Sequence, residues 1–236
     1  MGDEVNFSVP TGNFGDILAG YLAKQLGLPV GRLICASNAN NVLTDFIRTG
    51  TYDRQRPLLK TTSPSMDILV SSNLERLLYL LSGDTALVAS LMKQLNTEGS
   101  YTVPAGLLAR IQDEFWAACC DDARADEIMG RVYRDYVYLC DPHTASCWAA
   151  AEDYIAETGD AKAMVVLSTA SPYKFPVAVL TAIGGDTSGT EFEQMERLSR
   201  LSGVPIPRNL AGLQGKEEKH TGVIEKEAML DYVLSL

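Results

Sequence analysis

The sequence has little positive charge and no long apolar run. Its 236 residues carry 20 lysines and arginines against 30 aspartates and glutamates, a formal net charge of −10. That balance argues against a sequence-independent nucleic-acid binder, although backbone amides can still hold a small anion. No stretch approaches the ~20 apolar residues of a membrane span. Residues 1–5 lack the basic and apolar regions of a signal peptide, so we expect a cytoplasmic protein.

Cysteine and histidine are also scarce. The chain has five cysteines, an odd number, without a C-x-x-C pair, which favours reduced thiols over a disulfide framework. Cys140, His143 and Cys147 are the nearest approach to a zinc site, but their spacing matches no structural zinc pattern. We therefore predict no metal site.

What the sequence does contain is an alternation of strand and helix patterns. Residues 5–9 predict a strand, 16–27 a helix with one apolar stripe, 32–36 a second strand and 42–48 a second helix. Such a β–α–β–α order predicts the α/β class with a parallel sheet covered by helices. The length suits one sizeable domain over residues 1–236.

The middle of the chain reads differently from its two ends. Helical patterns dominate there, so we expect a helical insertion at about residues 84–136. The sheet pattern then returns, with an apolar strand at 163–168 that we expect to be buried. The individual expectations are a loop at 54–65, a helix in the second half of 68–81, helices at 85–95, 104–118 and 126–136, a strand at 137–140, and helices at 145–158, 176–183 and 226–234.

Polar clusters follow three of the predicted strands, at 11–16, 37–41 and 168–174, and the turn at 141–144 is a candidate fourth. Ligands of open parallel sheets bind outside the carboxyl ends of the strands. In the first cluster, Gly12 and Gly15 permit close backbone approach at a helix start, which favours an anion.

The residues alone leave a second interpretation open at each cluster. The first is equally consistent with a tight turn without a ligand, since it is neither G-x-G-x-x-G nor a P-loop. The asparagines of 38–41 are ordinary turn and cap residues. Thr169 follows an apolar strand and either faces a ligand or caps a turn. His143 is more often a turn or packing histidine than a catalyst.

Five motifs occur in one order: "VPTGNFGDILAGYLAKQLGLPV", "ASNANNVL", "SPSMDILVSSNLERLLY", "YLCDPHTA" and "STASPYKFP". Together they resemble the carboxy-terminal part of threonine synthase, a pyridoxal 5′-phosphate (PLP) enzyme of fold-type II. The resemblance extends from about Val5 into the last helix. It implies a parallel-sheet, three-layer α/β domain like that of the tryptophan synthase β family.

The resemblance also implies an activity and a set of contacts. Family members convert O-phospho-L-homoserine and water to L-threonine and phosphate, with PLP as electron sink. Residues that would cradle the cofactor phosphate are Gly12, Asn13, Phe14 and Gly15, and Thr169 would meet the pyridine nitrogen. Asn38, Asn40 and Lys174 are weaker candidates for lining the substrate site.

Two features depart from the family pattern. The family often has His-Pro-Ala-Lys-Phe where residues 171–175 read Ser-Pro-Tyr-Lys-Phe, and Asn41 replaces a common aspartate. The lysine that forms the Schiff base with PLP follows Ser-Phe in the family, and no lysine here does. We therefore expect a carboxy-terminal portion without the amino-terminal half, with no catalytic residue of its own and no activity alone.

Two alternatives remain beside this interpretation. The chain could be a non-catalytic module that holds PLP or another phosphate ligand. It could also be the assembly partner of a separate amino-terminal half, in which case an exposed apolar face should mark the docking site. The same face could instead be covered in a homodimer.

Overall fold

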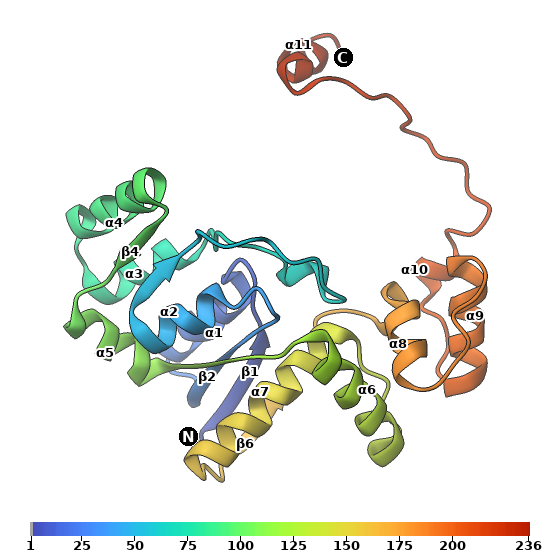
Figure 1. The fold of residues 1–236 in the computed structure, drawn as a ribbon, viewed down its shortest axis with the longest axis horizontal. Helices are drawn as coiled ribbons and strands as arrows, with labels where there is room; N and C mark the ends of the chain where they lie inside the picture. Colours follow the sequence, from blue (N-terminus) through green and yellow to red (C-terminus); the bar gives the residue numbers. More distant parts are fainter. Residues whose placement is uncertain (1) are drawn as a thin grey trace.

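A four-stranded parallel sheet forms the centre of the molecule in the computed structural model, which describes residues 2–236 (Figure 1). Its strand order is β5–β2–β1–β6, so β6 occupies a free edge. The strands are β1 (Val5–Pro10), β2 (Val30–Ser37), β5 (Phe115–Cys119) and β6 (Ala163–Val166). This arrangement confirms the predicted α/β class with a parallel sheet.

Helices cover both faces of the sheet because β2 is apolar on both sides. Leu33 and Cys35 belong to the core shared with α1 (Gly15–Gln25) and α2 (Val42–Thr49). Ile34 and Ala36 belong to the core shared with α7, whose bounds are Pro142–Thr158. Two-sided burial of this kind is typical of parallel strands.

A smaller helical unit packs beside α2. It consists of a two-stranded antiparallel sheet and three helices, which join the core of α1 and α2. Tyr52 and Tyr101 stack across the small sheet with ring centroids 5.3 Å apart. The elements are β3 (Thr51–Asp53), α3 (Leu74–Ser82), α4 (Thr85–Glu98), β4 (Ser100–Thr102) and α5 (Ala105–Glu114), and the 3₁₀ turn η1 (Pro64–Met66) lies between β3 and α3 along the chain.

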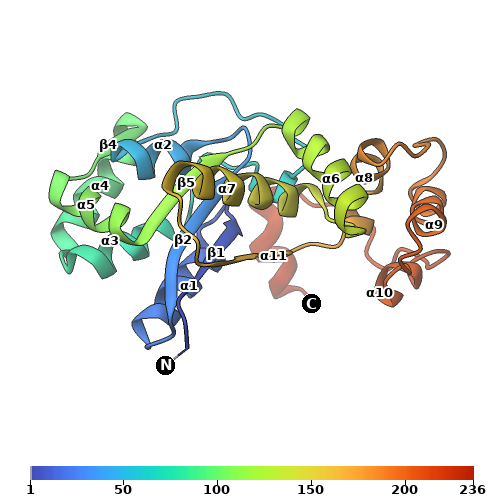
Figure 2. The ribbon, with the colours of Figure 1, turned by 90° about the horizontal axis from the view of Figure 1, so that it is seen from below.

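The remaining helices form a separate apolar cluster against α7. Beyond it, a long extended segment carries the last helix away from the body of the molecule (Figure 1), and residues 176–211 group at one end of the molecule (orange in Figure 2). Among residues 2–236, no helix is both long and apolar enough to cross a bilayer. The elements are α6 (Asp122–Tyr136), η2 (Pro172–Lys174), α8 (Pro176–Ala182), α9 (Glu191–Ser202), α10 (Arg208–Ala211), η3 (Lys226–Ala228) and α11 (Met229–Leu234).

Three local expectations are wrong. The helix expected at 104–118 ends at Glu114, and Phe115–Cys119 joins the central sheet, so the insertion at 84–136 is not uniformly helical. Residues 137–140 form no strand, because Val137 ends α6 in the left-handed conformation at φ 53°. The apolar strand expected to be buried lies at the sheet edge, where Val165 is 42% exposed.

Cysteine reactivity should follow this packing. Burial raises the thiol pKa of Cys35, Cys120 and Cys140 to about 12 and that of Cys147 well above its usual value, whereas Cys119 is exposed. Because the thiolate is the reactive form, we expect iodoacetamide at pH 7.5 to label one thiol per native chain and five in urea. Mass spectrometry counts the labels, and Cys119→Ser is the control that should remove the native label. Rapid labelling of two or more native thiols would contradict this packing.

Candidate functional site

The three polar clusters meet at one edge of the central sheet. Strand β1 runs parallel to β2 on one side and to β6 on the other, with Pro10 opposite Ala36 and Ser8 opposite Val166. The segments that follow these strands therefore leave the sheet at the same, carboxyl edge. This is where ligands of open parallel sheets bind.

The loop of residues 12–15 turns from β1 into α1. Among residues 2–236, no acceptor receives a hydrogen bond from its backbone N–H groups, and α1 has no side-chain cap. Its carbonyls are occupied: Ser71 Oγ donates to Gly12 O at 2.8 Å, and Asn73 N and Nδ2 donate to Asn13 O at 3.1 and 2.8 Å. Free amides at the start of an 11-residue helix suit an anion.

Phe14 anchors this loop in the core. Its backbone is left-handed (φ 61°, ψ 12°), an uncommon conformation for a residue with a side chain. The side chain is only 1% exposed, and its ring lies 5.5 Å from that of Phe115 on strand β5, which pairs with β2. Burial of the ring thus offsets the backbone cost and fixes the turn.

Gly12 and Gly15 allow other groups to approach this loop closely. A Cβ on Gly12 would lie 2.8 Å from the carbonyl oxygen of Ser65, and a Cβ on Gly15 would lie 3.3 Å from Asn73 Nδ2. The residues present therefore fit a phosphate group. The backbone N–H groups of the loop are unpaired, and the glycines carry no side chain that would clash with Ser65 or Asn73.

Asn38 and Asn40 bind a carboxylate of the chain itself. Asn38 Nδ2 and Asn40 Nδ2 donate to Asp67 Oδ1 at 2.8 and 2.9 Å, and Thr61 donates to both oxygens of Asp67. Both asparagines are buried. In this structure their amide groups tie the segment 61–67 to the end of β2.

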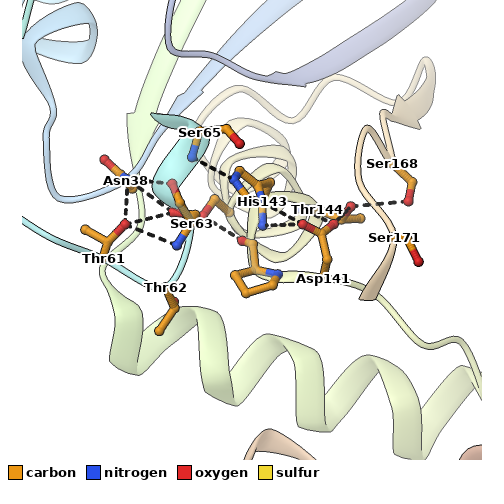
Figure 3. A network of polar contacts seen from close by, with 12 residues as sticks. Asn38, Thr61, Thr62, Ser63, Ser65, Asp141, His143, Thr144, Ser168 and Ser171 are labelled. Carbon is orange, nitrogen blue, oxygen red and sulfur yellow. Dashed lines mark hydrogen bonds and ion pairs between the residues drawn. The ribbon is translucent and has the colours of Figure 1, made fainter. Parts of the chain in front are cut away.

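A second buried network lies at the start of α7 (Figure 3). Asp141 accepts hydrogen bonds from the backbone N–H groups of His143 and Thr144 and from the Thr144 hydroxyl. Its Oδ2 lies 2.6 Å from His143 Nδ1. Burial favours the neutral acid, but the hydrogen bonds from His143 and Thr144 outweigh it and lower the pKa of Asp141.

Thr169 and Lys174 lie beyond β6. Thr169 is exposed, and its hydroxyl has no hydrogen-bond partner within residues 2–236. Lys174 is also exposed, with Nζ 6.0 Å from the centre of the Phe175 ring. It lines a cavity of about 470 Å³ together with Thr61 and Thr62.

Sequence reasoning missed the residues that hold the loop and the end of β2 in place. Ser65, Asp67, Ser71 and Asn73 all lie in the stretch "SPSMDILVSSN", which contributed to the resemblance but received no role. Four polar or charged contacts from one stretch became visible only in three dimensions. The dense run of serine and asparagine around an aspartate was the signal available in the sequence.

Comparisons with known proteins point to one family. The family model "Threonine synthase, C-terminal" matches residues 144–233. Threonine synthase of Pseudomonas aeruginosa is 40% identical over 92% of this chain, and that of Saccharomyces cerevisiae is 39% identical over 84%. Human threonine synthase-like 1 is 38% identical over 87%.

Two solved structures extend this likeness to the fold. Yeast threonine synthase covers 99% of this chain with a TM-score of 0.83 at 32% identity, over 48% of its own chain. PLP-bound threonine synthase from Brucella melitensis covers 82% with a TM-score of 0.74 at 41% identity, over 42% of its chain. The chain spans 28–46% of the length of the three relatives named above. Residues 144–233 match the carboxy-terminal domain of threonine synthases, and the chain as a whole is similar in sequence and fold to the carboxy-terminal part of these enzymes.

Proposed function

We propose that this chain provides the phosphate-binding and pyridine-binding side of a PLP site in a threonine synthase. The observation that carries the proposal is the set of unpaired amides at Gly12, Asn13, Phe14 and Gly15, at the carboxyl edge of the sheet. The whole reaction would be conversion of O-phospho-L-homoserine and water to L-threonine and phosphate. When bound, PLP supplies an electron sink for carbanions at the substrate.

The residues of this chain would bind and orient the cofactor. The loop amides would donate hydrogen bonds to the phosphate, favoured by the dipole of α1. The unpartnered Thr169 hydroxyl would donate to the pyridine nitrogen, a neutral contact that leaves this nitrogen unprotonated. Lys174, which lines this cavity with Thr61, is proposed to line the substrate side together with Asn38, which donates to Thr61, and Asn40.

No lysine of this chain follows Ser-Phe, the context in which the resemblance places the Schiff-base lysine. Lys24 lies in the last turn of α1, at the opposite end of that helix from the loop, and its ammonium pairs with Glu114 at 2.6 Å. We therefore propose that the chain binds PLP without a covalent bond and does not make threonine alone. Threonine release from O-phospho-L-homoserine by the pure chain would contradict this.

A phosphate-directed binding measurement tests the proposal. Isothermal titration calorimetry should show PLP binding at least ~10-fold more tightly than pyridoxal, which lacks the phosphate, because the loop amides contact only that group. Borohydride reduction should not attach the cofactor covalently to one specific lysine. Equal affinity for the two compounds would contradict the phosphate role, and a specific reduced lysine adduct would contradict non-covalent binding.

A matched pair of glycine variants refines this test. Gly12→Ala places a Cβ against Ser65 O and should displace the loop, lowering PLP affinity with little effect on pyridoxal. Gly106→Ala is the control, since nothing lies within 4 Å of the added carbon. Equal PLP affinity in both variants would exclude the loop as the phosphate site.

The exposed edge strand β6 is a candidate docking site for a partner of this chain. Val165 is exposed on one face of β6, while Met164 and Val166 on the other face line an apolar groove of about 490 Å³ with Tyr138 and Trp148. Parallel strands are normally covered on both faces, and a bare edge is ready to pair. We propose that the part of a threonine synthase that this chain does not match covers this edge.

Sedimentation measures that partnership directly. The chain should form a one-to-one complex with the unmatched part of a relative, and Val165→Lys should weaken the complex. A stable homodimer that the same substitution dissociates would favour self-association as the alternative.

A further inference from the structure

The buried histidine of α7 has no part in the contacts proposed so far. His143 is 2% exposed and lies in the first turn of the helix. Its Nε2 accepts a hydrogen bond from the backbone N–H of Ser65 at 3.2 Å (Figure 3). Because Nε2 acts as an acceptor, this hydrogen-bond network assigns the ring proton to Nδ1, which faces Asp141.

Asp141 and Phe175 fix the orientation of this ring. Asp141 Oδ2 accepts from Nδ1 at 2.6 Å, and this carboxylate is itself held by the backbone amides of α7. The ring of Phe175 lies against His143 with centroids 4.9 Å apart. The acceptor lone pair on Nε2 therefore points at one place, the amide of Ser65.

Ser65 in turn lies directly behind the loop of residues 12–15. Its carbonyl oxygen occupies the space that a Cβ on Gly12 would need. The same stretch, residues 65–73, donates to the loop carbonyls from Ser71 and Asn73. We name residues 65–73 the backing segment, because it occupies the loop carbonyls and leaves the loop amides free.

We propose that His143 is a positioning residue for the phosphate-binding loop. Its ring, oriented by Asp141, accepts from Ser65 N–H and holds the backing segment against Gly12, which aims the loop amides at a phosphate. The inference rests on the proposed function, and it deepens it by linking the start of α7 to the loop after β1. His143 transfers no proton and touches no substrate in this role.

Two polar substitutions separate the contact of His143 with Asp141 from its contact with Ser65. His143→Asn keeps a donor near Asp141 but is too short to accept from Ser65. His143→Gln reaches further and can supply an oxygen to the Ser65 amide. We expect His143→Asn to weaken PLP binding about tenfold with pyridoxal affinity unchanged, and His143→Gln to restore most of the loss.

Amide hydrogen exchange provides a readout that does not require PLP. His143→Asn should speed exchange at Ser65, whose amide donates to His143, and at Asn73, whose amide donates to the loop carbonyl of Asn13, while His143→Gln should stay near the wild type. Unchanged exchange in His143→Asn would overturn the proposal, and so would equal weakening of PLP and pyridoxal binding. If the wild type fails to distinguish PLP from pyridoxal, the proposed function fails, and the exchange result still decides the positioning role.

Discussion

Replacing Phe14 by alanine should lower the free energy of unfolding by about 3–5 kcal/mol. The ring is 1% exposed and packs against Phe115, so its removal leaves a cavity between α1 and β5. Alanine also keeps the unfavourable left-handed backbone at φ 61° without the burial that offsets it. Urea denaturation followed by circular dichroism measures the loss.

Phe14→Leu is the matched control for this substitution. Leucine retains most of the apolar volume and should cost less than about 1.5 kcal/mol. PLP affinity should fall in the alanine variant even under conditions where it remains folded, because the loop loses its anchor. A loss of stability below about 1 kcal/mol in Phe14→Ala would show that this side chain does not hold the turn.

Asp141→Asn should lower the free energy of unfolding at pH 7 by about 3 kcal/mol. The amide group of asparagine would face the N–H groups of His143, leaving buried donors opposite one another. Asp84→Asn is the control, because Asp84 caps α4 in an exposed position by accepting from Leu87 N, and asparagine caps equally well. That change should stay within a few tenths of a kcal/mol.

The difference in free energy of unfolding between the wild type and Asp141→Asn should also depend on pH. The pKa of Asp141 is lower in the folded protein than the usual value of about 3.9, so its charge stabilises the fold above that value. As the pH falls through the lowered pKa, this stabilising contribution disappears, and the free energies of unfolding of the two proteins should become equal. Denaturation curves from pH 7 to pH 3 test this, and a gap that stays constant would contradict the role of the charge.

Local patterns predicted the sheet and the loop well. The apolar run before Gly12 and the amphipathic run after Gly15 placed a strand, a turn and a helix where they occur. Strand β5 escaped detection because Ala117 and Ala118 also suit a helix, and only pairing with β2 selects the extended form. Tertiary context overrode local propensity there.

The support behind the loop could not be read from the sequence. Ser65 and His143 are 78 residues apart, and no local pattern in either motif predicts their hydrogen bond. Likewise, the apolar strand β6 predicted burial on both faces, whereas it lies at a free edge of the sheet in this structure. Sequence patterns report local conformation and apolarity, but they do not say which distant segment supplies the contact.

The central claim is that the amides at the start of α1 hold the phosphate of PLP. Two-dimensional ¹H–¹⁵N NMR during a PLP titration tests it most directly, since it reports on each amide separately. We predict the largest shifts at Gly12, Asn13, Phe14 and Gly15 with PLP, and small shifts there with pyridoxal. Shifts confined to other residues, with these four amides unmoved, would contradict the account.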